Sequence, residues 1–327
     1  MRTLYVSQQG CYLSLKQEQV IIKQGQAILD QVQLPLLEQI LIFGQSQVTT
    51  QVIRACLQQD VPIAYLSRMG YCYGKILPVE RGYRHPSREQ QQLLAAERLG
   101  VARTIVQAKL KNCRVLLLRQ QRRKGSAAIT LAIQSLEYLI QQAGQADRIE
   151  RLMGLEGAGA ASYFSAFGDC LSGDGFVFTA RSRRPPGNLV NAMLSFGYQL
   201  LWNHLLSLIE LWGLDPYHAC LHQGSERHAA LASDLIEEAP IVDSLVLYLV
   251  NRGVVNVEQD FDYHDGGCYL NDGGRRKYLR AFLQRMEEHL KIDDQEQPRW
   301  DLLTQQVKAY KQFVYDPTRA YSPYLIR

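Results

Sequence analysis

The segment Glu80-Arg81-Gly82-Tyr83-Arg84-His85-Pro86-Ser87 separates two parts of the chain that carry different sequence patterns. It is polar and contains both Gly and Pro, which is typical of a linker. Before it, residues 1–80 contain short apolar runs bounded by turn-forming or polar residues, the pattern of β-strands. After it, from Arg88 onward, apolar residues recur at helical spacing. With 327 residues, the chain is long enough for two domains that each bury a core.

The N-terminal part, residues 1–80, is predicted to form a small β-sandwich, because short strands follow one another at high density. One helix over residues 50–59 interrupts them, with Thr49 or Thr50 as its N-cap. The strands are expected at residues 4–6, 11–15, 20–23, 39–43, 63–66 and 71–77. Residues 81–87 are the predicted linker.

The C-terminal part, residues 88–327, is predicted to be all-α, so the chain is expected to have an α+β fold with a larger helical domain. Residues 262–272 contain Gly266-Gly267 and are expected to form a small turn or hairpin. The tail from residue 315 has no period, and we expect it to be partly disordered. Helices are expected at 88–114, 126–143, 146–168, 188–212, 225–236, 240–252 and 273–291, with a weaker one near 299–315.

The bulk composition limits the class of protein. The net charge of +4 and the pI near 8.6 are only mildly basic, but residues 98–124 carry nine Lys and Arg and no acidic residue. Because such a run exceeds what solubility needs, it favours binding to a phosphate backbone over a solvated helical face. No GxxxxGK[ST] or GxGxxG motif occurs, so nucleotide hydrolysis and dinucleotide binding lack support.

The cysteines and the apolar runs point to a cytoplasmic protein. The seven cysteines are scattered and form no CxxC pair, which indicates reduced thiols and argues against a zinc ribbon. The N-terminus enters a strand-like pattern directly, so we expect no signal peptide. No run approaches ~18 apolar residues, so no membrane span is expected.

Glu156 is the first candidate for chemistry, since it lies in Gly154-Leu155-Glu156-Gly157-Ala158-Gly159. A carboxylate among small and apolar neighbours is costly unless it is paired or bound to a metal. Three glycines also lower helix propensity, so the segment must gain either close helix contact or room for a ligand. The competing interpretation is an exposed or capping glutamate.

A second group of candidates lies between residues 218 and 238. Asp234, Glu237 and Glu238 share one face of a predicted helix, and His222 lies a short loop upstream. Such a set suits Mg²⁺ or Mn²⁺ better than zinc. The alternatives are a solvated helical face and a histidine of the surface or core. We expect Glu238 to face solvent and rank His218 and His228 below His222 as ligands.

Five short motifs follow one another along the chain: Gly-x-Glu-Gly at 154–157, Arg183-Arg184-Pro185-Pro186, the segment Asn191-Ala192-Met193-Leu194-Ser195-Phe196-Gly197-Tyr198, Leu221-His222, and Asp234-Leu235-Ile236-Glu237. In this order they resemble the CRISPR-associated integrase, the metal-dependent nuclease of spacer acquisition. The resemblance implies that Glu156, His222 and Glu237 bind the metal in an α-helical catalytic domain, with Asp234 beside them or as an alternative ligand. It also implies a homodimer built through the N-terminal sandwiches and a complex with a small ferredoxin-like second protein.

The DNA partners of such an enzyme would be a spacer precursor and a repeat. The basic loop residues Arg181, Arg183 and Arg184 precede Pro185-Pro186 and are expected to contact the substrate together with Arg227. The aromatic residues Tyr163, Tyr217 and Trp212 can stack on unpaired bases or serve as core residues. Two other functions remain open: a non-catalytic nucleic-acid-binding scaffold, and a metal nuclease outside CRISPR adaptation.

Overall fold

The computed structural model describes residues 2–67, 72–78, 85–225, 228–292 and 295–326. The chain divides into two compact units. The smaller one comprises Met1–His85 with Glu210–Gly213, and the larger one comprises Pro86–Ile209 with Leu214–Arg327. Of the predicted linker, residues 81–84 lie outside the described part, and residues 85–87 begin helix α2 (His85–Gln92).

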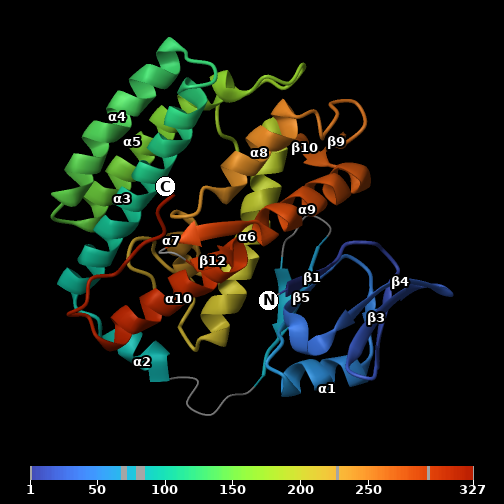
Figure 1. Cartoon of the computed structure of the whole chain (residues 1–327). Coiled ribbons are helices and arrows are strands. Elements are labelled where there is room, and N and C mark those ends of the chain that lie inside the picture. Colours follow the sequence, from blue (N-terminus) through green and yellow to red (C-terminus); the bar gives the residue numbers. More distant parts are fainter. Residues whose placement is uncertain (1, 68–71, 79–84, 226–227, 293–294, 327) are drawn as a thin grey trace. The chain divides into compact units, whose positions relative to one another are not determined.

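The smaller unit contains two four-stranded sheets (Figure 1). In the first sheet β1, β5 and β7 are parallel and β8 pairs with β7 antiparallel. In the second sheet β3 lies antiparallel between β2 and β4. The first sheet has the order β1 (Arg2–Val6), β5 (Leu37–Phe43), β7 (Ile63–Leu66), β8 (Cys72–Ile76), and the second has the order β4 (Ala27–Gln33), β3 (Gln19–Gln24), β2 (Tyr12–Lys16), β6 (Gln47–Val48).

One apolar core joins both sheets of this unit. Leu13 and Val20 from the second sheet and Ile40 from the first are fully buried in the same cluster. Helix α1 (Thr50–Gln58) adds Val52, and its first turn is capped by the predicted Thr49. Strand β4 was not predicted, because its apolar and polar residues do not alternate in the sequence. In the structure all of its side chains except that of Val32 are exposed.

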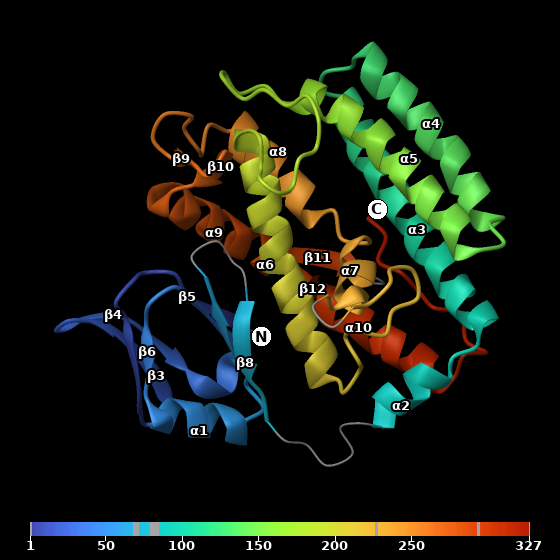
Figure 2. The ribbon, with the colours of Figure 1, turned by 180° about the vertical axis from the view of Figure 1, so that it is seen from behind.

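The larger unit is helical, and α3, α4 and α5 lie side by side in it (Figures 1 and 2). Helix α6 is buried along most of its length, as predicted. None of the helices among the described residues has the length and apolar character needed to cross a membrane. After α2, the helices are α3 (Ala95–Gln121), α4 (Ala127–Gly144), α5 (Ile149–Phe167), α6 (Leu189–Leu211), α7 (Ala230–Ile236), α8 (Ile241–Asn251), α9 (Asp272–Glu287) and α10 (Arg299–Tyr315), with short 3-10 turns at Leu34–Leu36 and Gly168–Cys170.

Two hairpins interrupt the helices, so the larger unit is not all-α as predicted. Strands β9 (Phe261–His264) and β10 (Gly267–Leu270) form the hairpin expected around Gly266-Gly267. Strands β11 (His289–Ile292) and β12 (Gln295–Pro298) form a second hairpin, where a helix was predicted to run to residue 291. The predicted α+β fold is confirmed.

Two helix boundaries differ from the prediction in ways that affect the site. The helix predicted at 88–114 is two helices, and α3 continues to Gln121. Helix α7 begins at Ala230 rather than at residue 225. The backbone of Ser225 instead accepts a hydrogen bond from the His228 amide at 2.9 Å, so Ser225 does not cap this helix.

Candidate active site

Helix α5 approaches α3 closely at Gly159. A side chain at Gly159 would overlap Leu110 of α3, whereas a side chain at Gly157 would meet open space. The sequence predicted either close helix contact or room for a ligand as the reason for these glycines. Close contact applies to Gly159, and open space applies to Gly157. Because Glu156 lies one turn before Gly159, its carboxylate reaches Lys109 of α3.

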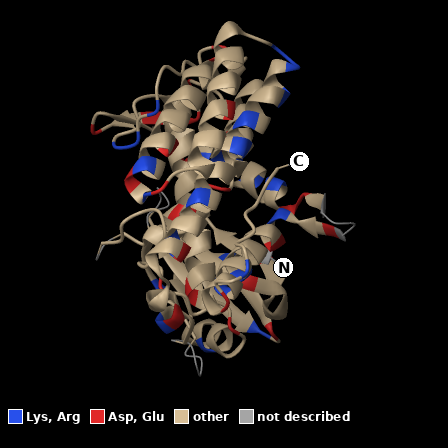
Figure 3. Cartoon of the chain, turned by 90° about the vertical axis from the view of Figure 1, so that its left-hand side faces the viewer, with Lys and Arg blue, Asp and Glu red and all other residues tan. Residues whose placement is uncertain are grey.

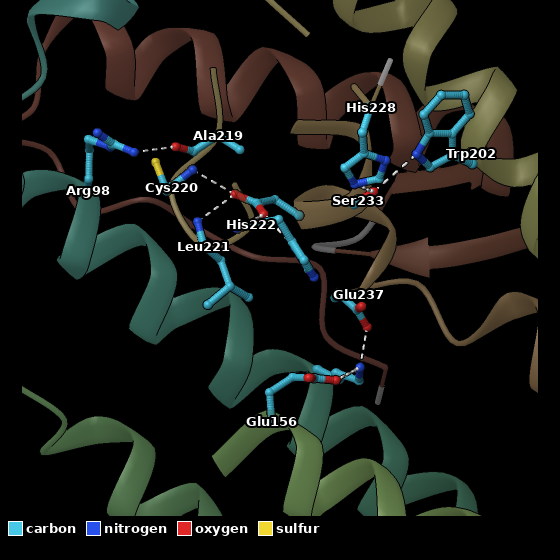
Figure 4. A network of polar contacts seen from close by, with 12 residues as sticks. Arg98, Glu156, Trp202, Ala219, Cys220, Leu221, His222, His228, Ser233 and Glu237 are labelled. Carbon is cyan, nitrogen blue, oxygen red and sulfur yellow. Dashed lines mark hydrogen bonds and ion pairs between the residues drawn. The ribbon is translucent and has the colours of Figure 1, made fainter. Parts of the chain in front are cut away.

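Lys109 is the centre of an ion-pair cluster that joins three helices, and its two carboxylate partners are labelled in Figure 4. Its ammonium group pairs with Glu156 of α5 and with Glu237 at the end of α7. The three side chains are 12%, 14% and 17% exposed, respectively. Burial lowers the pKa of the Lys109 ammonium, but the Glu237 and Glu156 carboxylates outweigh this effect and the pKa is raised from its ordinary value.

Asp234 positions the loop that carries His222. Its side chain is fully buried on α7. Its oxygens accept hydrogen bonds from the backbone amides of Cys220 at 2.7 Å, Leu221 at 2.9 Å and His222 at 2.9 Å. Asp234 also contacts the His222 ring, with 2.8 Å between Oδ1 and Nδ1. These four contacts occupy the carboxylate, so Asp234 holds both the backbone of this loop and the ring of His222 in place.

The contact with Asp234 fixes how His222 is presented. A carboxylate only accepts hydrogen bonds, so Nδ1 of the ring donates to Asp234, and in the neutral imidazole Nε2 then carries the free electron pair. Figure 4 shows the ring pointing toward the side where Glu237 lies. Burial lowers the pKa of His222, but the Asp234 hydrogen bond and the charges of Asp234, Glu237 and Glu156 outweigh it, and the pKa is raised.

The carboxylates and the imidazole are groups that a divalent cation can bind. In this structure, however, they are not arranged to coordinate one. No group of three or more His, Cys, Asp and Glu side chains in the described ranges is spaced to hold a metal ion. Glu156 and Glu237 are instead bridged by the Lys109 ammonium. With Asp234 the cluster contains three carboxylates against one lysine, so negative charge remains that a hard cation can neutralise.

Glu238 does not face solvent, and the prediction for it is wrong. Its side chain is fully buried and accepts hydrogen bonds from Gln306 Nε2 at 2.9 Å, Tyr321 Oη at 2.8 Å and the Tyr324 amide at 2.9 Å. Burial raises the pKa of Glu238 to about 8, although these donors favour the ionised form. The residue after Glu237 therefore anchors the C-terminal tail.

The tail after α10 packs against the larger unit, so the prediction of partial disorder is wrong. Tyr321 is buried, and the tail runs to α3, where the C-terminus lies in Figure 1. There Asn112 donates to the carbonyls of Glu238 at 2.7 Å and Tyr324 at 2.9 Å, and accepts from the Ile326 amide at 2.9 Å. Asn112 thus ties the turn after α7 to both α3 and the tail.

The residues predicted to contact DNA have different environments. Arg181 donates to Asn191 Oδ1 at 3.0 Å and Ser195 Oγ at 3.1 Å, so it braces its loop. Arg183 and Arg184 are exposed. The Tyr163 ring is 2% exposed and packs in the core, which does not match the prediction that it stacks on a base, whereas Tyr217 is 49% exposed. Arg227 lies outside the described residues.

The basic run of α3 serves partly to hold the larger unit together. Arg98 donates to the Ala219 carbonyl at 2.9 Å, Arg103 donates to the Ala146 carbonyl, and Arg114 pairs with Glu137 at 3.1 Å. Figure 3 shows acidic residues among the basic ones on the helices that face the viewer. Lys111 and Arg119 of the run are exposed, and Arg122, Arg123 and Lys124 at its end form an exposed basic cluster.

The two competing histidines do not contact the carboxylates. The exposed His228 ring contacts Ser233 Oγ at 3.2 Å, and the same hydroxyl accepts from Trp202 Nε1 at 3.2 Å (Figure 4). His218 lies in the preceding loop, and its carbonyl accepts a hydrogen bond from Gln90. The structure brings together Glu156, His222, Asp234 and Glu237, and not these histidines.

Comparison with known proteins places the chain in a family. The model of the family described as CRISPR associated protein Cas1 matches residues 4–284. A CRISPR-associated endonuclease Cas1 of Thermus thermophilus is 33% identical over 290 residues, which cover 88% of this chain and 87% of that protein. The chain belongs to the Cas1 family. The family match ends before α10 and the tail.

Two further relatives show how far the similarity extends in fold and in chain length. A CAS1 protein from Thermotoga maritima has the same fold with a TM-score of 0.80, at 27% identity and 97% coverage of both chains. A CRISPR-associated exonuclease Cas4/endonuclease Cas1 fusion of Geobacter sulfurreducens is 33% identical over 300 residues, or 88% of this chain. The chain spans about half of that fusion, 53% of its length.

Sequence reasoning missed two features of this Cas1 site. Lys109 was grouped with phosphate-binding residues, although the apolar Ile105, Val106 and Cys113, three or four residues away on the same helix face, indicate that its side chain points inward. The partners of Glu238 gave no such signal, because Tyr321 and Tyr324 lie more than 80 residues away in sequence.

Removing one hydroxyl tests the tail anchor. Tyr321→Phe leaves the buried Glu238 carboxylate with one donor fewer, so the unfolding free energy is expected to fall by about 1–3 kcal/mol. Chemical denaturation would measure it, with Tyr138→Phe, whose ring is 61% exposed, as the control that changes stability by less than ~0.5 kcal/mol. Equal stability of the two variants would show that this hydrogen bond does not hold the tail.

Proposed function

We propose that this Cas1 family member is a metal-dependent DNA endonuclease and integrase that inserts new segments at a CRISPR repeat. The observation that carries the proposal is the meeting of Glu156, Glu237 and the oriented imidazole of His222 between α3, α5 and α7. The names of the relatives as CRISPR-associated endonucleases support the nuclease part.

Glu156, His222 and Glu237 are the proposed ligands of Mg²⁺ or Mn²⁺. Two carboxylates and one imidazole form a hard donor set, which suits these ions better than zinc. A bound divalent cation would supply charge neutralisation at the scissile phosphate and activation of the attacking oxygen. Asp234 keeps the proton on Nδ1 of His222, so that Nε2 is available as a ligand.

Cutting and joining are the same displacement at phosphorus with different nucleophiles. A new oxygen–phosphorus bond forms as the opposite one breaks, in line. When water attacks, the result is hydrolysis. When the 3′-hydroxyl of an incoming DNA segment attacks, that segment becomes joined to one side of the repeat and a 3′-hydroxyl is released from the other. The site residues support both reactions, so the nucleophile that the bound DNA supplies decides between them.

The DNA path is proposed to cross the exposed loop of Arg183 and Arg184. Both side chains are free to reach phosphates, while Arg181 braces the loop behind them. Arg227 and the exposed Tyr217 remain proposed contacts, and Tyr163 is withdrawn because its ring is covered. The exposed cluster Arg122, Arg123 and Lys124 is a second basic surface for the backbone.

The proposed partners are a second copy of this chain and the small ferredoxin-like protein of the adaptation complex. The smaller unit offers a surface for the copy: strand β4 is at the edge of its sheet and exposes Ile28 by 52% and Leu29 by 42%. An exposed apolar edge strand offers unpaired backbone groups with which a strand of another chain can pair.

A non-catalytic nucleic-acid scaffold is the second candidate. The observation in its favour is the Lys109 ammonium between the carboxylates, which would block a metal if the contact were permanent. A scaffold would bind DNA without joining it, so a joining assay separates the two functions.

Single substitutions in the proposed ligand set test catalysis. Glu156→Ala, His222→Ala and Glu237→Ala should each reduce joining by about 100-fold or more, and combining them should add little, since residues that act as one unit are not lost twice. The assay would follow joining of a 3′-hydroxyl DNA end into a repeat-containing plasmid with Mn²⁺ and the partner protein.

Gel-shift affinity would be followed in parallel and should survive in the three variants. His228→Ala is the matched histidine control and should join DNA like the wild type. Joining by His222→Ala at the wild-type rate would refute the proposed ligand set, and normal wild-type DNA binding with no joining under any metal would favour the scaffold.

The exposed arginines are tested through the salt dependence of binding. The double variant Arg183→Ala/Arg184→Ala should weaken DNA binding and reduce the slope of log affinity against log salt by about 2, because two phosphates are no longer neutralised. A control with the same change of charge, Lys16→Ala/Arg54→Ala on the smaller unit, should leave the slope unchanged. Equal slopes in all three proteins would mean that the loop does not contact DNA.

A further inference from the structure

Lys109 stands between the two carboxylates that the proposed function assigns to a metal. Its ammonium pairs with Glu156 from α5 and Glu237 from α7, and all three side chains are mostly buried. Two such carboxylates repel each other and are costly to bury without a compensating charge. In the metal-free protein, the ammonium therefore provides the attraction that keeps them together.

A divalent cation needs the same oxygen atoms. A ligand carboxylate must turn a lone pair toward the metal, and Glu156 and Glu237 already direct oxygens at the ammonium. Two positive charges held a few ångströms apart in a partly buried site repel strongly. The ammonium and the metal therefore cannot share these oxygens at full occupancy, whereas the long, flexible lysine side chain can move aside.

The other buried carboxylates of this region are not exchangeable in this way. Asp234 is held by three backbone amides and a histidine ring, and Glu238 by a glutamine, a tyrosine and a backbone amide. These donors are fixed parts of the fold. Glu156 and Glu237 share a partner on a flexible stem.

We propose that Lys109 is a displaceable counter-ion, which holds Glu156 and Glu237 together until a divalent cation takes its place, and which thereby sets the affinity for that cation. The inference rests on the proposed function of these two residues as metal ligands. It makes Lys109 a positioning residue rather than a phosphate-binding one, which was its role in the sequence prediction.

The backbone of the site has supports that do not involve Lys109. Asn112, one turn later on α3, donates to the Glu238 carbonyl at 2.7 Å and so ties the turn that carries Glu237 to α3. Asp234 independently holds the loop of His222. A neutral residue at position 109 therefore leaves the backbone that carries Glu237 and His222 in place but removes the competing charge.

Mn²⁺ binding to the full chain tests this, measured by the loss of the free-ion signal in electron paramagnetic resonance. Lys109→Met should bind Mn²⁺ about 10-fold more tightly or better, which corresponds to about 1.4 kcal/mol. Its melting temperature without metal should fall, and Mn²⁺ should raise it by more than in the wild type. Lys111→Met, an exposed lysine on the same helix, is the matched control and should match the wild type.

Glu237→Ala separates this inference from the function on which it rests. If Glu237→Ala binds Mn²⁺ as the wild type does, the proposed metal site is wrong and the inference falls with it. If Glu237→Ala loses Mn²⁺ but Lys109→Met binds with unchanged or weaker affinity, the metal site stands and only the counter-ion role is overturned.

Lysine labelling of the wild-type protein decides the question even if Lys109→Met does not fold. Acetylation followed by mass spectrometry would compare the reactivity of Lys109 with and without Mn²⁺. Displacement from the carboxylates should raise the reactivity of Lys109 and leave that of the exposed Lys111 unchanged. Reactivity of Lys109 that stays constant or falls when Mn²⁺ binds would overturn the proposal.

Discussion

Compensation of buried carboxyl groups governs the arrangement of the larger unit around α7. Asp234, Glu237 and Glu238 lie on or next to one short helix, and Glu156 joins them from α5. A buried carboxylate is tolerated only with hydrogen-bond donors or a cation. The loop of residues 220–222, the C-terminal tail and the inward-pointing lysine of α3 each supply one of these partners.

The partners divide the carboxylates into two kinds. Asp234 and Glu238 are satisfied by several donors that belong to the fold, so they hold a loop and a tail in place. Glu156 and Glu237 share one ammonium group, that of Lys109. Under the proposed function, this division allows a site that is stable without metal and still accepts one: fixed hydrogen bonds maintain its frame, and the Lys109 ion pairs occupy its centre.

Local sequence signals predicted the fold and the residues that meet at this site, but not how their charges are compensated. Glycines beside Glu156, and the spacing of His222 and Glu237, are short-range features that the chain shows directly. The burial of Glu238 depends on Tyr321, which the chain brings back only after α8, α9 and α10. The side chain of Lys109 points inward because α3 packs closely against α5. The sequence did not predict this, because Lys109 lies in a run of basic residues that was interpreted as a phosphate-binding surface. Strand β4 was missed because its apolar residues do not alternate with polar ones, and the β11–β12 hairpin because its strands are short and β12 is polar.

Anomalous diffraction from crystals soaked in Mn²⁺ tests the central claim most directly, because it locates the ion without depending on activity. The account predicts one strong peak bounded by Glu156, His222 and Glu237, with the Lys109 side chain turned away from both carboxylates, and no peak there in Glu237→Ala. A Mn²⁺ peak elsewhere in the larger unit, with Lys109 still bridging Glu156 and Glu237, would contradict it.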